Sequence, residues 1–272
     1  MSEPRDSGRN MAARGRAGAS RSEAATPRTG ATRRKGAPAA NLRAPPLLTR
    51  RTLQDNVYEY LREGLMAGEF GPGARLTVRG VAAAIGTSIM PVREAFRRLT
   101  SEGALEPLST GATRVPVFDL SKLQDLYEIR INVEGLAARR AAHRVSEEDL
   151  KTLELHQAEL QKALENNDRA AASKANEKFH FLIYRAAQSS ELVRIIETLW
   201  LQVGPYLAWV LKQTDSQPVR GRDARAFRHH KDILQALRRH DADQAEEAIR
   251  SDLSMSVAFL VDNVRSLPKS SE

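Results

Sequence analysis

The stretch TSIMPVREAFRRL, residues 87–99, constrains the fold of this chain more than any other segment. Three large apolar side chains recur in it at the spacing of a single helix face: Val92, Phe96 and Leu99. Ser88 is expected to cap this helix, and Pro91 fits its first turn, where the amides have no intrahelical partner to lose. Arg93 and Arg97 are four residues apart and share another face. That face is either a solvated basic surface or one that enters a nucleic-acid groove.

Residues 51–117 predict a winged helix–turn–helix domain. Apolar residues recur at helical spacing over 53–67, and the glycines and proline of FGPG then mark a turn. A second helix is expected over VRGVAAAI (78–85), ended by Gly86, and the helix described above follows it. ALEPLSTGATRVPV (104–117) indicates two short strands around a glycine-containing turn. In a domain with this order of elements, the third helix lies in the major groove of DNA.

The positive charge of the chain lies in its first fifty residues. Residues 1–50 hold eleven Lys and Arg against three acidic residues, which accounts for the entire formal net charge of +8. This tail has almost no large apolar side chains, so it cannot bury enough surface to offset its ordering entropy and is expected to be disordered. Three interpretations stay open: a solvated leader or misassigned start, a basic arm on DNA phosphates, or an organelle transit peptide.

Two absences in the sequence limit the function. The chain has no cysteine, which excludes a disulfide scaffold, a thiolate nucleophile and a zinc site with cysteine ligands. It also has no run of about 18 apolar residues, so no membrane-spanning helix and no membrane partner are expected. Both features are compatible with a reducing cytoplasm, which is the expected location.

Residues 118–266 predict an all-α helical bundle, followed by a short tail over 267–272. Ion-binding side chains are spread over this domain, two of them four residues apart on one helix face: Asn176, His180, His230 and Asp252. Imidazole and carboxylate groups that converge inside a bundle are how such folds build a metal site. These four residues are therefore the candidate metal ligands.

Residues 68–115 resemble the DNA-binding domain of the GntR family of bacterial transcription regulators, in the PG turn, the PVREA segment and the glycine of the wing. The family position after Ser88 is commonly an arginine, and here it is Ile89. An apolar side chain cannot make a bidentate contact to guanine, although it could touch a thymine methyl group. The resemblance and the helix faces together give this set of expected DNA-contacting residues: Arg79, Ser88, Ile89, Arg93, Arg97 and Gly111.

Three segments of the helical part (127–142, 176–187 and 230–253) resemble the FCD domain of the FadR subfamily. The resemblance implies an antiparallel bundle of six or seven helices that often holds a divalent ion through one Asp and three His, with a small organic or sugar acid bound above it. Here Asn176 stands at the position of the Asp, and Asp252 at the position of one His. This set suits Zn, Ni or Mn. The alternative is a polar pocket that holds the effector without metal.

Arg130 and Glu134 match an R-x-x-x-E pattern in the first helix of the FCD domain. One interpretation has Arg130 binding an effector carboxylate with both ends of its guanidinium group. The other is an intrahelical ion pair between the two residues, which is worth only a few tenths of a kcal/mol.

The predicted function is a homodimeric, ligand-responsive transcription regulator that binds a double-stranded DNA operator and is not an enzyme. The first alternative is a metal-dependent enzyme acting on small carboxylates. Against it, the sequence has no HExxH, GxSxG or phosphate-loop motif, and no obvious general base accompanies His180. The second alternative is a nucleoid protein that binds DNA without sequence preference through its basic tail.

Overall fold

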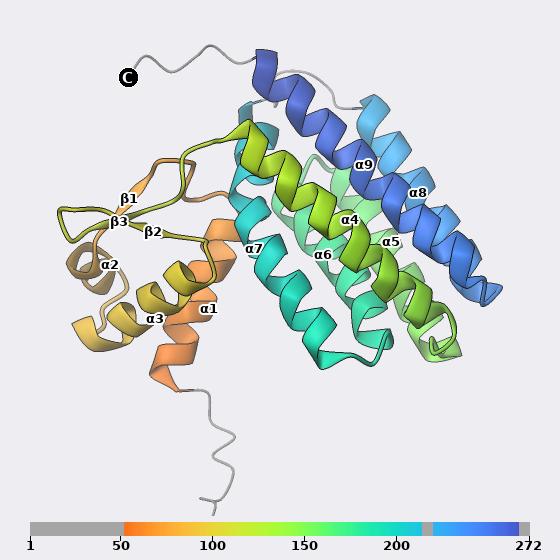
Figure 1. Ribbon diagram of the computed structural model, residues 1–272, viewed down its shortest axis with the longest axis horizontal. Helices are drawn as coiled ribbons and strands as arrows, with labels where there is room; N and C mark the ends of the chain where they lie inside the picture. The colour runs from red at the N-terminus through yellow and green to blue at the C-terminus, as the bar shows by residue number, and fades with distance from the viewer. Residues whose placement is uncertain (1–51, 214–219, 267–272) are drawn as a thin grey trace, which may run out of the picture. The chain divides into compact units, whose positions relative to one another are not determined.

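The computed structural model describes residues 52–213 and 220–266, without the side chains next to the omitted segments (Figure 1). Among the helices described, none combines the length and the apolar character that crossing a bilayer requires. The tails predicted at both ends of the chain lie outside the described residues.

The first part of the described chain has three helices and a small sheet. The elements follow in this order: α1 (Leu53–Met66), β1 (Arg75–Leu76), α2 (Val78–Ala84), α3 (Ile89–Ser101), β2 (Glu106–Pro107) and β3 (Thr113–Arg114). A capping box between Thr52 and Asp55 starts α1, and the Thr77 hydroxyl caps α2. The apolar face predicted for α3 is buried against α1, with Val92 and Leu99 fully enclosed.

The three strands form an antiparallel sheet in the order β1-β3-β2. The predicted hairpin is present as β2 and β3, whereas β1 was not expected from the sequence. Arg114 of β3 lies opposite Arg75 on one side and Glu106 on the other, and its guanidinium donates a hydrogen bond to the Glu106 carboxylate. Gly111 has φ of 78° between the two hairpin strands, a left-handed conformation that favours glycine.

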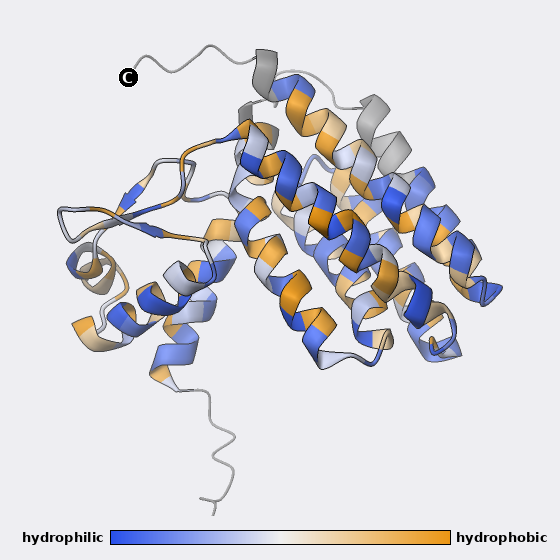
Figure 2. Ribbon diagram, in the orientation of Figure 1, coloured by the Kyte–Doolittle hydropathy of each residue, from blue (hydrophilic) through white to orange (hydrophobic). Residues whose placement is uncertain are grey.

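Six helices of the described chain form the second part. They are α4 (Leu120–Ala142), α5 (Glu147–Glu165), α6 (Arg169–Ala186), α7 (Ser190–Gln213), α8 (Arg220–Arg238) and α9 (Ala242–Ser266). The predicted fold class, a winged helix–turn–helix followed by an all-α bundle, is thus confirmed. Helices α4, α7 and α9 each carry both apolar and hydrophilic positions (Figure 2), as expected where one face is buried.

The start of α4 differs from what its local sequence pattern indicates. Ser121 and Gln124 have the spacing of a capping box, but the N-cap residue is Asp119, whose carboxylate accepts hydrogen bonds from the amides of Ser121 and Lys122. An ionised carboxylate is a strong acceptor for first-turn amides, so it takes the capping position from a serine two residues later.

Helix α7 is continuous, although Gly204 and Pro205 are residues that usually interrupt a helix. Pro205 lies inside the helix and is buried. Its burial helps to offset the amide hydrogen bond that a proline lacks. A side chain at Gly204 would collide with Met66 of α1, so the two helices approach closely at that point. Leu201, one turn earlier, belongs to the apolar core of the first part, whereas its neighbour Trp200 belongs to the bundle core.

Candidate functional site

The first turn of α3 presents two apolar side chains to solvent. Ile89 is 40% exposed and Met90 is 55% exposed, whereas the next two residues, Pro91 and Val92, are buried. Ser88 is the N-cap residue, but its hydroxyl makes no capping hydrogen bond. The start of the helix therefore has an apolar tip beside a hydroxyl that the helix does not use.

Helices α2 and α3 carry the three arginines that were predicted to contact DNA. Arg79 on α2 and Arg93 on α3 are exposed, and neither forms an ion pair with another residue in the described ranges. Arg97 bonds to Glu94 with Nη1–O distances of 2.8 and 3.0 Å. Its side chain is 69% exposed, so this pair is solvated and worth less than about 1 kcal/mol. A phosphate could therefore replace Glu94 as its partner at little cost. Nothing lies within 4 Å of the Cβ that Gly111 lacks, so the wing is open there.

A second group of functional side chains lies inside the bundle. His180 on α6, His230 on α8 and Asp252 on α9 are all buried, and their ligand atoms lie within 4.8 Å of one another. The two imidazoles meet with 3.2 Å between their Nε2 atoms, and His180 Nε2 lies 3.5 Å from an Asp252 oxygen. The packing of three helices thus brings together residues that are far apart in the sequence.

The separation of the two imidazole nitrogens fits a bound cation. Two nitrogens that each bond a tetrahedral zinc ion lie roughly 3.3 Å apart, and the observed 3.2 Å is close to that value. Two imidazoles and a carboxylate also match the ligand types of zinc, nickel and manganese sites. Asn176, the fourth predicted ligand, lies one turn before His180 on α6 and is half-buried. Its role as a ligand stays a prediction.

A chain of hydrogen bonds leads from α4 to His180. Arg130 Nε donates to Glu134 Oε1 at 2.6 Å, and the hydroxyl of Tyr184 donates to the other oxygen of Glu134. The same hydroxyl lies 3.1 Å from His180 Nδ1. All four residues are buried.

These bonds determine which nitrogen of His180 carries the proton. Glu134 pairs with Arg130 and accepts, so the single hydroxyl proton of Tyr184 is used for Glu134. Toward His180 the tyrosine oxygen can then only accept, and Nδ1 of His180 must donate. Its Nε2 is left with a bare lone pair that faces His230 and Asp252, which is the tautomer that binds a metal ion.

Burial keeps both imidazoles neutral. It lowers the pKa of His180 well below its usual value, and repulsion from a proton on His230 and from the Arg130 guanidinium lowers it further. Burial, together with His229, lowers the pKa of His230 to about 3. Burial also raises the pKa of the Tyr184 hydroxyl, as does the neighbouring Glu134 carboxylate. Near pH 7 the site therefore offers two neutral imidazoles, the form that metal ions bind.

Arg130 is more enclosed than either interpretation from the sequence implies. Its guanidinium lies 4.8 Å from the centroid of the Tyr127 ring and 4.9 Å from that of Trp200. It forms the ion pair with Glu134 that was one of the alternatives, but the pair is buried rather than solvated. Burial opposes the charge of Arg130, and the Glu134 carboxylate outweighs it and raises the pKa of the guanidinium. Contact between Arg130 and an effector stays a prediction.

Tyr184 was missed in the sequence, and one signal could have found it. It follows His180 by four residues and therefore lies on the same face of α6. Trp200 closes the site from α7, 5.6 Å from the His180 ring centroid.

Comparison with known families agrees with both parts of the fold. Residues 53–115 match the model described as bacterial regulatory proteins, gntR family, and residues 125–254 match the FCD domain. Among curated proteins, a probable D-xylose utilization operon transcriptional repressor of Paenarthrobacter nicotinovorans is 32% identical over 205 residues, covering 74% of this chain and 86% of that protein. The HTH-type transcriptional regulator McbR of Escherichia coli is 29% identical over 200 residues, covering 74% and 89%.

Solved structures give the same result. The structure of E. coli McbR/YncC superposes with a TM-score of 0.73 at 29% identity, covering 79% of this chain and all of that one. A GntR-type regulator from Rhodococcus sp. RHA1 superposes with a TM-score of 0.62 at 21% identity, covering 77% and 97%, and supports the fold alone.

Proposed function

Because the chain belongs to the GntR family of bacterial regulators and carries an FCD domain, we propose that a small acid bound in the bundle controls its affinity for an operator. The related proteins are transcription regulators, and this chain is a transcription regulator rather than an enzyme. The proposed parts are the metal ion, the acid, the homodimer and the roles of single residues.

In this proposal α3 enters the major groove and α2 supports it at the backbone. Arg93, one turn into α3, is exposed and has no ion-pair partner in the described ranges, so it can reach a base edge or a phosphate. Arg79 and Ser88 have the same freedom. Ile89 is the apolar side chain closest to the helix start, where it can contact a thymine methyl group.

A divalent ion would be held in the bundle by His180, His230 and Asp252, with Asn176 as a further oxygen ligand. When bound, the ion supplies the positive charge that attracts a carboxylate. Tyr184 holds the imidazole of His180 in the ligating tautomer. Three ligands carry at most one negative charge between them, so a divalent ion keeps net positive charge for an anionic effector.

The observation that carries the proposal is the convergence of two neutral imidazoles and a carboxylate inside the bundle of a DNA-binding chain. Metal analysis of the purified protein should find about one ion per chain, followed by a thermal-shift screen of sugar acids and other small carboxylates. The relative's name, which refers to D-xylose utilization, makes sugar acids the first compounds to screen.

The matched variant is Asp252→Asn, which keeps the size of the side chain and removes its charge. It should lose the ion and the thermal response to the acid, and still bind DNA from upstream of its own gene in a gel shift. Failure of the unaltered protein to shift that DNA at low salt, with or without added metal, would refute operator binding.

A further inference from the structure

Aromatic rings enclose the side chains that would hold the acid and the ion. The guanidinium of Arg130 lies 4.9 Å from the centroid of the Trp200 ring, and the centroids of the Trp200 and His180 rings are 5.6 Å apart. Phe179 stacks on His230 with 4.1 Å between ring centroids. All of these side chains are buried. An acid can therefore reach Arg130 or His180 only if one of the side chains around them moves.

Most hydrogen-bonding groups in this enclosure already have partners. Both oxygens of Glu134 accept hydrogen bonds, and the Tyr184 hydroxyl takes part in two. Arg130 donates from Nε and Nη2 to Glu134, whereas its Nη1 donates to no residue in the described ranges. One guanidinium nitrogen is thus left to bind a carboxylate oxygen.

These surroundings favour an acid with an apolar body over a sugar acid. A sugar acid carries a hydroxyl group on nearly every carbon atom, and each hydroxyl buried without a partner costs binding free energy. A flat aromatic ring has no such group, and it can stack on an aromatic side chain or on a guanidinium. The described side chains around Arg130 therefore fit an aromatic carboxylate.

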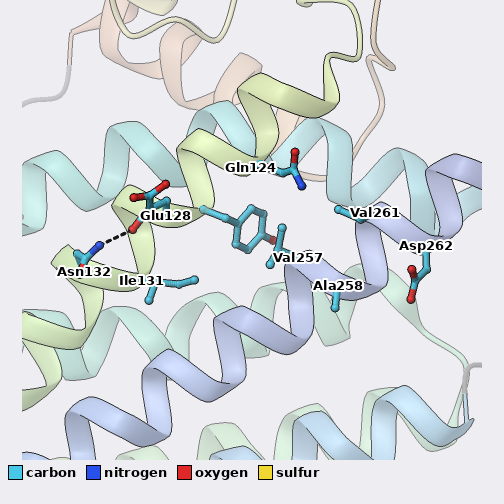
Figure 3. Close-up of a pocket in the computed structure, with 9 residues that line it drawn as sticks. Gln124, Glu128, Ile131, Asn132, Val257, Ala258, Val261 and Asp262 are labelled. Atoms are coloured by element: carbon cyan, nitrogen blue, oxygen red, sulfur yellow. Dashed lines mark hydrogen bonds between the residues drawn. The ribbon is translucent and has the colours of Figure 1, made fainter.

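A second apolar surface lies close to Arg130. A groove of about 460 Å³ runs between α4 and α9 (Figure 3), and its lining includes Tyr127, Ile131 and Val257. Tyr127 also faces Arg130, with 4.8 Å between its ring centroid and the guanidinium. Arg130 itself does not line the groove. An acid in the groove would therefore touch the guanidinium only after Tyr127, which is 1% exposed, had moved.

Trp200 is the side chain of this enclosure that can move at the lowest cost. It is 9% exposed, whereas Phe179 and Tyr184 are fully enclosed. Its indole Nε1 is buried and has no hydrogen-bond partner in the described part of the chain, although a buried tryptophan usually finds one. Turning outward would give this N–H group to water and would break no hydrogen bond of the indole.

We propose that the acid is a flat aromatic carboxylate and that the indole of Trp200 fills its place until it binds. The inference rests on the proposed function, which supplies the acid and the ion, and it names the class of acid. When the acid enters, the indole turns outward and the ring of the acid stacks on Arg130 in its place. Nη1 of Arg130 then donates to the carboxylate, so the guanidinium keeps an aromatic neighbour and gains a hydrogen bond.

Tryptophan fluorescence tests the movement, because the chain has only two tryptophans, Trp200 and Trp209. Trp209→Phe leaves Trp200 as the only one. When benzoate is added to this variant in the presence of zinc, the emission should shift to longer wavelength, since a buried indole becomes exposed to water. Zinc alone should not cause this shift. Benzoate that raises the melting temperature and leaves the emission unchanged would overturn the proposal.

A comparison of three acids tests the ligand class. Benzoate, cyclohexanecarboxylate and D-xylonate are titrated into the zinc-loaded full-length protein by calorimetry. Benzoate should bind at least about tenfold more tightly than D-xylonate, which is the ratio that one unsatisfied hydroxyl produces. It should also bind more tightly than cyclohexanecarboxylate, whose ring is not flat. D-xylonate that binds as tightly as benzoate would overturn the aromatic class.

Two matched substitutions distinguish a side chain that gives way from one that holds the acid. Trp200→Phe makes the ring that must move smaller, so benzoate should bind several-fold more tightly. Trp209→Phe is the same change further along α7 and should leave the affinity for benzoate unchanged. Equal or weaker binding by Trp200→Phe would show that the indole does not occupy the place of the acid. Circular dichroism confirms that both variants fold.

The results separate this inference from the proposed function. A sugar acid that binds and changes the affinity for the upstream DNA would refute the aromatic class and leave control by an acid in place. If none of the acids binds to the zinc-loaded protein, both the inference and the proposed acid site fail, whereas operator binding is decided by the gel shift.

Discussion

Replacing Tyr184 with Phe tests how the bundle prepares His180 for a metal ion. The change removes one hydroxyl that donates to Glu134 and accepts from His180 Nδ1. Loss of such a supporting hydrogen bond typically lowers metal affinity by about 10–100-fold. It also leaves two buried polar groups with one partner fewer, at about 1–3 kcal/mol for each group that stays unsatisfied. We therefore expect a weaker site and a lower free energy of unfolding together.

The assay is a competition titration against a chelator of known affinity, with urea unfolding of the metal-free protein alongside. Tyr206→Phe is the matched control, because it removes a part-buried tyrosine hydroxyl that donates to the Val117 backbone oxygen, away from the histidines. It should lose stability without losing metal affinity. If Tyr184→Phe binds the ion within about threefold of the unaltered protein, the tyrosine does not set the tautomer of His180, and the reasoning fails.

Three further predictions concern the DNA surface and the acid sensitivity of the site. Arg93→Ala should weaken operator binding by about 1–3 kcal/mol in fluorescence anisotropy, with unchanged affinity as the contradicting result. Ile89→Arg should strengthen binding or shift preference toward guanine across a panel of operator variants, and if neither occurs, position 89 does not face DNA. The folded chain keeps His230 neutral down to a pKa of about 3, whereas the unfolded chain takes up this proton near pH 6.5. The metal-free protein should therefore lose up to about 1.4 kcal/mol of stability for each pH unit below 6.5 in urea unfolding. His230→Gln should show a shallower slope, and equal slopes would contradict the argument.

Helical periodicity predicted most of the fold. The apolar spacing of α3 predicts that helix, and the glycine and proline residues between helices predict where its neighbours end. Each of these patterns depends only on residues that lie close together in the chain. β1 was not predicted because two residues are too few to show the alternation of apolar and polar side chains. Arg75 and Leu76 become a strand only by pairing with β3. The unbroken α7 also depends on distant packing, since Pro205 looks like a break until α1 covers that segment.

The candidate metal site was likewise predictable from the sequence only in part. His180, His230 and Asp252 could be singled out one by one from their residue types and positions on helices. Their mutual distances could not, because these follow from the packing of α6, α8 and α9. The bond between Tyr184 and Glu134 joins residues fifty positions apart, so no local pattern contains it. Arg130 was expected either to bind an effector carboxylate or to pair with Glu134, and only the fold shows that the pair is enclosed by Tyr127 and Trp200.

The position of Leu201 has a consequence for protein engineering. Its side chain completes the core of the winged domain, although it belongs to a helix of the other domain. A chimaera that joins this winged domain to a foreign bundle at the linker would leave that side chain behind. The resulting void would be comparable to a buried Leu→Ala change, which costs about 2–5 kcal/mol. Exchange of winged domains and bundles between such regulators should therefore succeed more often when residue 201 and its contacts on α1 are transferred with the winged domain.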